Sequence, residues 1–279
     1  MARFRDQQSN DGFTDHDYLT VLLEPIRKCG EYTPKFGRGG KKGFTLEEFR
    51  QHYQSDQFYS WFGLDNPLMY AAHKAAGGMT SIYRQIGIGC EALFRYILCN
   101  ELGLSEKDVQ WSYTVRKADG GTRTLALDAR IPFESVKDPM RLKEIEQWAY
   151  VQAKQLELDD SIKRNLNGIV FEVRQGYKSK DSKRQNADIA NAASAYTKAY
   201  LPCVVVLSSQ IDSDISNRYT MERWVLLTGL PSNDPYISTY AFTRKVIGYD
   251  LAAFFERNEH ILRKEVDVVL QKLLSPENP

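Results

Sequence analysis

The sequence has few of the residues that build zinc clusters and nucleophilic triads. Only four of its 279 residues are cysteine and four are histidine. The cysteine spacings match no zinc-binding pattern, so we expect Cys90, Cys99 and Cys203 to be small core residues in a reducing compartment. The histidines are scattered without a serine or cysteine in a partner pattern, which argues against nucleophilic catalysis by a triad.

Long apolar runs are absent and the net charge is small. No stretch approaches the roughly 20 consecutive apolar residues of a transmembrane helix, and residues 1–6 are too polar for a signal peptide. The formal net charge of +1 does not by itself indicate a polyanionic partner. We therefore expect a soluble, cytoplasmic protein with no membrane partner.

The apolar patterns predict an α/β or α+β fold, with a helical N-terminal subdomain (1–104) and a second domain (105–279). Helices are expected at 15–28, 45–53, 58–62, 67–76, 80–102, 139–160 and 249–274. Strands are expected at 109–116, 122–131, 201–208 and 224–228, with a further strand from Gly168. The glycines at positions 77 and 78 are expected to separate two helices. These elements predict a mixed central β-sheet flanked by helices.

The stretch from Gly168 to Tyr200 concentrates the polar chemistry of the chain. An apolar, buried strand contains one carboxylate, Glu172, and a helix rich in alanine ends the stretch. Between them stands a group of cations: Lys178, Lys180, Lys183 and Arg184. A carboxylate on a core strand is costly to bury unless a cation or a metal meets it. A basic loop directly after that strand suggests that the partner of this carboxylate binds together with a phosphate group.

Strand alternation predicts which side chains share a face. In the strand 122–131, Asp128 lies on one face and Leu125, Leu127 and Ile131 lie on the other. Glu172 shares a face with Arg174 on the following strand. If these two strands are neighbours in the sheet, Asp128 and Glu172 converge. Two converging carboxylates are the usual protein contribution to a Mg²⁺ site, because Mg²⁺ completes its shell with water and phosphate oxygens.

An acid on one strand, an acid-x-cation on the next and a basic segment before a helix resemble the PD-(D/E)XK nuclease superfamily, and in particular its type II restriction endonucleases. The resemblance covers residues 111–209 and implies a restriction-endonuclease-like fold. It implies that Asp128 is the first metal-binding acid, although Leu127 replaces the expected proline, and that Glu172 is the second. Arg174 stands where the family has lysine. Arginine gives up no proton at any useful pH, so it stabilises charge but does not act as a base.

The resemblance leaves alternatives for the remaining roles. The catalytic lysine is then Lys178 or Lys180, just past the end of the strand. In a variant of the family pattern the second acid lies on the following helix, where Asp188 would replace Glu172. Glu91 fits a further habit of the family, in which a helix glutamate holds a water molecule. The preferred set is Asp128, Glu172 and Lys178, with Glu91 as an auxiliary.

The basic segment is either a solvated surface loop or a DNA contact. Cations fix phosphates, whereas arginine and amide side chains can also read base edges. The expected DNA-binding residues are Lys178, Lys180, Lys183, Arg184 and Asn186. The glycine-rich basic loop 35–43 is either a linker or an arm on the DNA backbone, and the aromatic side chains in 58–62 are expected in the subdomain core, with base stacking as the alternative.

These expectations combine into a Mg²⁺-dependent type II restriction endonuclease that cuts double-stranded DNA as a homodimer. Two-fold symmetry suits a palindromic site, and the apolar C-terminal helix 249–274 is the expected dimer element. One rival is a catalytically inactive DNA-binding module of the same fold. Another is an unrelated α/β enzyme whose loop 35–43 binds a phosphorylated small molecule.

Overall fold

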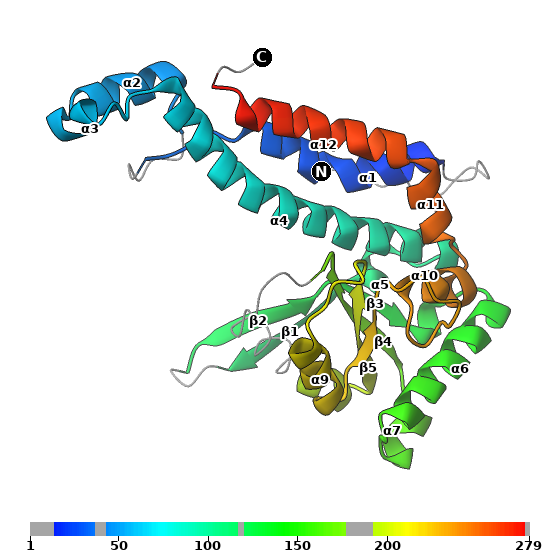
Figure 1. The fold of residues 1–279 in the computed structure, drawn as a ribbon. Coiled ribbons are helices and arrows are strands. Elements are labelled where there is room, and N and C mark those ends of the chain that lie inside the picture. The colour runs from blue at the N-terminus through cyan, green and yellow to red at the C-terminus, as the bar shows by residue number, and fades with distance from the viewer. Residues whose placement is uncertain (1–13, 37–42, 117–119, 177–191, 277–279) are drawn as a thin grey trace. The chain divides into compact units, whose positions relative to one another are not determined.

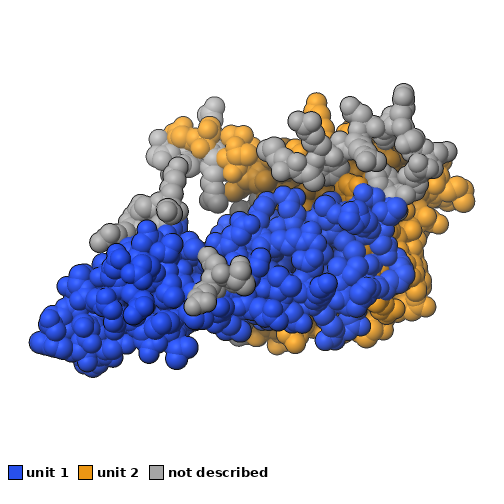
Figure 2. All heavy atoms as spheres, turned by 90° about the horizontal axis from the view of Figure 1, so that it is seen from above, with its two compact units in different colours: residues 1–89, 257–279 blue, residues 90–256 orange. Residues whose placement is uncertain are grey.

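In the computed structural model, residues 14–36, 43–116, 120–176 and 192–276 are described (Figure 1). The chain divides into two compact units, one formed by residues 1–89 with 257–279 and the other by residues 90–256 (Figure 2). The fold is α+β, with helices and a mixed central sheet, as the sequence predicts. No helix among the described residues is both long and apolar enough to cross a membrane.

The first unit is helical. Its elements are α1 (Asp15–Arg27), η1 (Lys28–Glu31), α2 (Leu46–Gln54), α3 (Gln57–Trp61), the first part of α4 (Pro67–Leu102) and α12 (Glu259–Leu274). Capping boxes begin α1 at Thr14 and α2 at Thr45, which satisfies main-chain N–H groups that a helix start leaves open. Helix α1 lies along α12 (Figure 1), and the Arg27 guanidinium donates to the Glu265 carboxylate at 2.9 Å.

Helix α4 is continuous, so the expected break at Gly77 and Gly78 is wrong. A Cβ atom on Gly77 would lie 2.3 Å from the hydroxyl oxygen of Tyr32, and one on Gly78 would lie 2.5 Å from a methyl carbon of Leu273. The two glycines therefore allow neighbouring side chains to pack closely against the helix. This packing offsets the low helix propensity of glycine, which is about 1 kcal/mol below that of alanine.

The aromatic side chains of α3 do not join the core, contrary to expectation. A separate aromatic cluster is built on the buried Phe44, on Phe49 of α2 and on Tyr70 of α4. Phe58 and Phe62 are exposed, and Trp61 is 75% exposed. Helix α3 has only five residues and reaches this cluster through Tyr59, which stacks on Tyr53 with ring centroids 5.0 Å apart. The rings of Phe58 and Trp61 on α3, and that of Phe62 directly after it, face solvent.

The second unit contains two sheets. Strands β1 (Trp111–Arg116) and β2 (Thr122–Leu127) form an antiparallel hairpin. Strands β3 (Ala129–Pro132), β4 (Gly168–Arg174), β5 (Tyr200–Val206) and β6 (Val225–Leu227) form a four-stranded sheet in that order. Strand β3 is antiparallel to β4, whereas β4, β5 and β6 are parallel. In the expected hairpin turn, Asp119 lies outside the described residues and Gly120 has a φ of 82°, which glycine adopts without strain.

The expected single strand 122–131 is interrupted at Asp128, and its two halves belong to different sheets. The interruption changes which side chains share a face. Leu125 and Leu127 pack in the apolar cluster that contains Val170. Ile131 instead pairs with Ile169, which points to the opposite face of β4. The prediction that the three apolar residues of this strand share one face is therefore wrong.

Helices flank the four-stranded sheet, as predicted. On one face, Val170, Val204 and Val206 pack against helical residues 192–197 and α9 (Ser213–Met221). On the other face, the Phe171 ring meets Phe94 of α4 at 5.1 Å and Phe242 at 6.0 Å between centroids. Phe242 ends α10 (Thr239–Phe242) and also contacts Trp148 of α6 (Pro139–Gln155).

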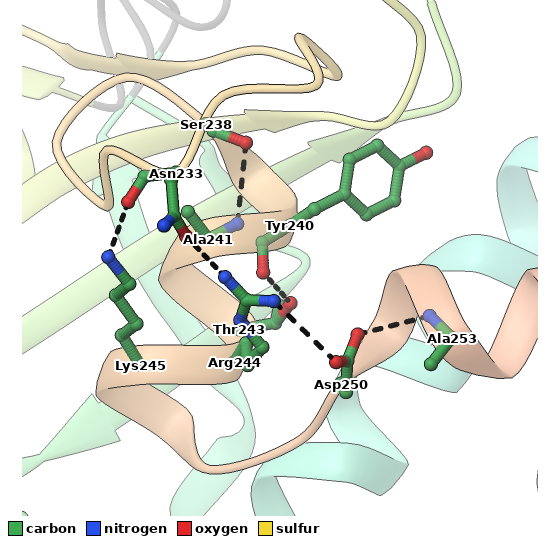
Figure 3. A network of polar contacts seen from close by, with 9 residues as sticks. All are labelled: Asn233, Ser238, Tyr240, Ala241, Thr243, Arg244, Lys245, Asp250 and Ala253. Atoms are coloured by element: carbon green, nitrogen blue, oxygen red, sulfur yellow. Dashed lines mark hydrogen bonds and ion pairs between the residues drawn. The ribbon is translucent and has the colours of Figure 1, made fainter.

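The remaining elements are short: α5 (Glu106–Val109), η2 (Phe133–Ser135), α7 (Asp160–Arg164), η3 (Thr243–Ile247) and α11 (Leu251–Arg257). The predicted helix 139–160 ends at Gln155, and the predicted long final helix is interrupted at Asn258. A polar network joins η3 to the loop that precedes α10 (Figure 3). Arg244 contacts Asn233 and Asp250, and Lys245 Nζ donates to the Asn233 carbonyl at 2.6 Å.

Candidate active site

The pairing of β3 with β4 brings the two predicted acids together. Ala129, the first residue of β3, is opposite Phe171 in the antiparallel register. Asp128, directly before β3, donates its main-chain N–H to the Phe171 carbonyl and therefore lies beside the part of β4 that carries Glu172. Arg174, two residues along β4, contacts both carboxylates. Its guanidinium is ion-paired with Glu172 and lies 3.7 Å from Asp128 Oδ2. The structure therefore joins Asp128, Glu172 and Arg174 in one cluster, and we call Asp128 and Glu172 the acid pair.

The cluster is largely withdrawn from solvent. All seven residues of β4 are buried. The side chains of Glu172 and Arg174 are 8% and 7% exposed, and that of Asp128 is 19% exposed. Burying a carboxylate on a core strand is unfavourable unless a partner compensates its charge, and a guanidinium with fixed donors is a suitable partner. Asp128 is the more exposed acid of the pair.

Three hydrogen bonds hold Asp128 at the bend between β2 and β3. The Val173 main-chain N–H donates to Asp128 Oδ2 at 2.8 Å. The main-chain N–H of Asp128 donates to the Phe171 carbonyl at 2.9 Å, and Arg95 Nη1 donates to the Asp128 carbonyl at 2.7 Å. These contacts explain why the strand is interrupted here, because Asp128 bonds to β4 through both its main chain and its side chain.

Arg95 is a member of this site that the sequence analysis missed. It lies on α4, four residues after Glu91, so the two side chains project from the same side of the helix. Glu91 itself is half-buried. The spacing of Glu91 and Arg95 is visible in the sequence, but the acceptor of the Arg95 hydrogen bond is a main-chain carbonyl, which no side-chain pattern reveals.

The residues expected to complete the site lie outside the described part of the chain. They are Lys178, Lys180, Lys183, Arg184, Asn186 and Asp188. Strand β4 ends at Arg174, so this basic segment follows the acid pair after a few residues. Residues 37–42 of the predicted basic loop also lie outside the described residues.

Two further cations lie over aromatic rings of the second unit. The Arg130 guanidinium is 5.8 Å from the Trp111 ring and 6.0 Å from the Tyr200 ring. The ammonium group of Lys198, an exposed residue, is 4.9 Å from the Trp111 ring and 5.5 Å from that of Tyr113. Arg130 lies on β3 opposite Val170, and its guanidinium also donates to the Asp108 carbonyl at 2.8 Å. The sequence analysis assigned no role to this group.

The donor set of the acid pair fits Mg²⁺. Mg²⁺ takes one or two carboxylates and keeps several waters or phosphate oxygens in its shell. Among the described residues, no three or more histidine, cysteine or acidic side chains form a group that could hold a metal. Cys90 and Cys203 are buried as predicted, and Cys99 is partly buried. Burial raises the pKa of the Cys90 thiol to about 12 and that of Cys99 to about 11, which disfavours the thiolate form that binds metal.

Comparisons with protein-family models, curated proteins and solved structures find no significant match to this chain.

Proposed function

We propose that the protein is a Mg²⁺-dependent endonuclease that hydrolyses phosphodiester bonds in double-stranded DNA at specific sites, like the type II restriction endonucleases it resembles. One observation carries the proposal. The Arg174 guanidinium contacts the carboxylates of both Asp128 and Glu172, so the two acids lie in one cluster. The basic segment that follows β4 in the sequence adds the cations that a phosphate backbone requires.

Each member of the cluster has a distinct role in this proposal. Asp128 and Glu172 would supply the carboxylate oxygens that hold Mg²⁺, and the bound ion would lower the pKa of a water molecule and offset negative charge on the phosphate. Arg174 keeps its proton at any working pH, so it positions the Glu172 carboxylate and compensates its charge. The lysine that polarises the attacking water is Lys178, with Lys180 as the alternative. Glu91 is an auxiliary that positions water.

DNA contact is assigned to cations in two parts of the chain. The first comprises the predicted DNA-binding residues of the basic segment. The second is the pair of Arg130 and Lys198, whose cationic groups lie over the Trp111 ring. Neutralising several phosphates releases counterions, so duplex binding should weaken steeply as the salt concentration rises.

We further propose that the protein acts as a homodimer, because cutting both strands of a palindrome calls for two-fold symmetry. Helix α12 presents the apolar side chains of Val268 and Leu274 to solvent, even though Val269 and Leu273 are buried in its own unit. Replacing Val268 with glutamate should shift the protein toward the monomer in sedimentation experiments, while an unchanged dimer would exclude this surface.

A second candidate is a DNA-binding module without catalytic activity. The observation that favours it is the contact of Arg174 with both acids, because a guanidinium in this position already compensates their charge. In that case the cluster stabilises the sheet and DNA binding persists without cleavage. The alternative of a phosphorylated small molecule at loop 35–43 depends on residues of which most lie outside the described part of the chain.

The test is cleavage of a long natural DNA with and without Mg²⁺ by the wild-type protein and by Asp128→Asn and Glu172→Gln variants. Asparagine keeps an oxygen that can accept the Val173 N–H, so the bend should persist. We expect discrete fragments that require Mg²⁺ and an activity loss of at least about 100-fold in each variant, by analogy with other disrupted metal sites. The exposed Glu222, which follows α9, provides a matched control, and Glu222→Gln should cleave normally.

The other outcomes separate the alternatives. Loss of cleavage in Asp128→Asn alone would move the second acid from Glu172 to Asp188 or Glu91. Salt-sensitive DNA binding without cleavage would identify a binding module. Neither cleavage nor binding would contradict the whole proposal.

A further inference from the structure

A cavity of about 290 Å³ lies between α6 and α7 in the second unit. Its charged and aromatic lining comprises Phe133, Lys143, Glu146, Tyr150, Lys163 and Arg164. Phe133 directly follows β3, whose last residue, Pro132, pairs with Gly168 at the start of β4. Glu172 stands four residues further along β4, which corresponds to about 13 Å of strand. The cavity is therefore separate from the acid pair.

The two helices supply the polar groups of the cavity in a fixed arrangement. Lys143, Glu146 and Tyr150 occupy positions i, i+3 and i+7 of α6, which lie on one face of a helix. Helix α7 supplies Lys163 and Arg164. Asp160, at the start of α7, accepts from Lys163 Nζ at 2.6 Å and lies 3.8 Å from the Arg164 guanidinium. The Lys163 side chain is only 15% exposed. The α7 cations are thus held in place by their own helix.

The charge of the lining points to a doubly charged anion. Three cations, Lys143, Lys163 and Arg164, face one carboxylate, Glu146, so the lining side chains carry a net charge of +2. A phosphate monoester carries about −1.5 to −2 near neutral pH, whereas each phosphodiester of a DNA backbone carries a single charge. Asp160 lowers the local charge, but it is mostly exposed and does not line the cavity.

Shape and apolar lining favour a ligand that also carries a ring. The rings of Phe133 and Tyr150 line the same cavity as the cations, and aromatic side chains stack well on nucleobases. Small-molecule pockets begin at roughly 300 Å³, so the cavity suits one nucleotide and is too small for a duplex. We propose that this cavity binds a phosphomonoester of mononucleotide size, with its phosphate between α6 and α7 and its base against the aromatic rings.

Calorimetric titration of the full chain tests the proposal without any cleavage readout, so its result is independent of the proposed nuclease activity. The probes are deoxyadenosine 5′-monophosphate, inorganic phosphate, deoxyadenosine and a duplex without terminal phosphates. We expect the monophosphate to bind, inorganic phosphate to compete with it, and deoxyadenosine to bind at least about tenfold more weakly, because a hydrogen bond to a charged group is lost.

Charge variants assign the binding to the cavity. Lys143 and Arg164 are exposed at its rim, so Lys143→Gln and Arg164→Gln should fold normally and each should weaken monophosphate binding about tenfold. Glu146→Gln should tighten it, because a repelling charge is removed. Lys107 is exposed on α5 and does not line the cavity, so Lys107→Gln should leave the affinity unchanged.

Two results would overturn the proposal. One is monophosphate binding that is absent or unaffected by Lys143→Gln and Arg164→Gln. The other is an effect of these variants on duplex binding alone, which would make the cavity part of a DNA-binding surface. If inorganic phosphate binds as tightly as the monophosphate, the phosphate site is supported and the contact of the base with the aromatic rings is excluded.

Discussion

Replacing Arg174 with methionine tests the central contact of the candidate site. Methionine preserves much of the apolar volume of arginine but removes the charge that compensates Glu172. Because both side chains are buried, the pair belongs to the class in which removal of one partner leaves a poorly solvated charge. Such a loss costs about 3–5 kcal/mol, whereas an exposed ion pair contributes about 0–1 kcal/mol.

The size of this effect can be measured in the unit that contains the pair. Trp111, Trp148 and Trp224 are buried in the second unit, whereas Trp61 in the first unit is exposed. Tryptophan fluorescence during urea unfolding therefore reports mainly on the second unit. We expect Arg174→Met to lower its free energy of unfolding by about 3 kcal/mol or more.

A double variant separates the lost charge compensation from simple loss of packing. Glu172→Gln removes the acid charge, so Glu172→Gln/Arg174→Met should be more stable than Arg174→Met alone by at least about 1 kcal/mol. Arg164→Met is the matched control, because Arg164 pairs with Asp160 at the surface, and it should cost less than about 1 kcal/mol. The reasoning would be refuted by an Arg174→Met variant as stable as this control, or by a double variant that shows no recovery.

Three further predictions concern other parts of the chain. A hydrogen bond from Arg257 lowers the pKa of Asp15 below its ordinary value of 3.8. The pair therefore stabilises the protein above that pH, and its contribution is lost as the pH falls through the lowered pKa. At about pH 6, Asp15→Asn should lower the free energy of unfolding by up to about 1 kcal/mol, the contribution of a surface pair, and the melting temperatures of the two proteins should converge in strong acid. Since burial raises the pKa of Cys90 to about 12, its alkylation at pH 8, followed by mass spectrometry, should be about a thousandfold slower in the native protein than after unfolding, and equal rates would contradict the burial. Gly77→Ala should lower the melting temperature despite the higher helix propensity of alanine, because its Cβ would meet Tyr32, and the sign should reverse in a Tyr32→Ala background.

The acid pair was predictable because it depends on local patterns. Asp128 and Glu172 each interrupt an apolar pattern, and the prediction assumed that the strands carrying them are neighbours. That assumption was sufficient to place the acids near each other, although the alternation of side chains does not continue through the bend at Asp128. The structure supplies that neighbour relation through the pairing of β3 with β4.

The bend at Asp128 was not predictable from the same patterns. The local sequence around it is apolar and alternating, which favours an uninterrupted strand. The hydrogen bonds that create the bend come from residues 33 and 45 positions away in the sequence, Arg95 and Val173. A local pattern contains no information about such partners.

The continuity of α4 also depends on partners that are distant in sequence. Adjacent glycines are a strong local signal for a helix end, and they misled the prediction because the partners that need the space, Tyr32 and Leu273, are distant in sequence. The cavity beside α6 was missed for a related reason. The α6 residues of the cavity show a visible helical spacing. The contribution of α7 depends instead on how the short segments that join α7 to α6 and to β4 fold.

Arg174 stands where the nuclease superfamily that the sequence resembles has lysine, and the structure gives a physical reason for the arginine. A lysine at this position could lose its proton when buried, which would leave Glu172 without a compensating charge. Arginine remains charged and offers donors to two acids at once, and the structure uses this by placing Arg174 between Glu172 and Asp128. The arginine therefore compensates the charge of Glu172 on the buried strand β4 and of Asp128 at the bend, but it does not transfer a proton. In the proposed nuclease, proton transfer comes from a different residue, Lys178. An Arg174→Lys variant should therefore keep the cluster folded without cleaving DNA faster than the wild type, and it should not restore the cleavage that Lys178→Gln loses. Recovery of cleavage by Arg174→Lys in the Lys178→Gln background, measured as DNA fragments per unit time, would show instead that the strand position can still perform the proton transfer.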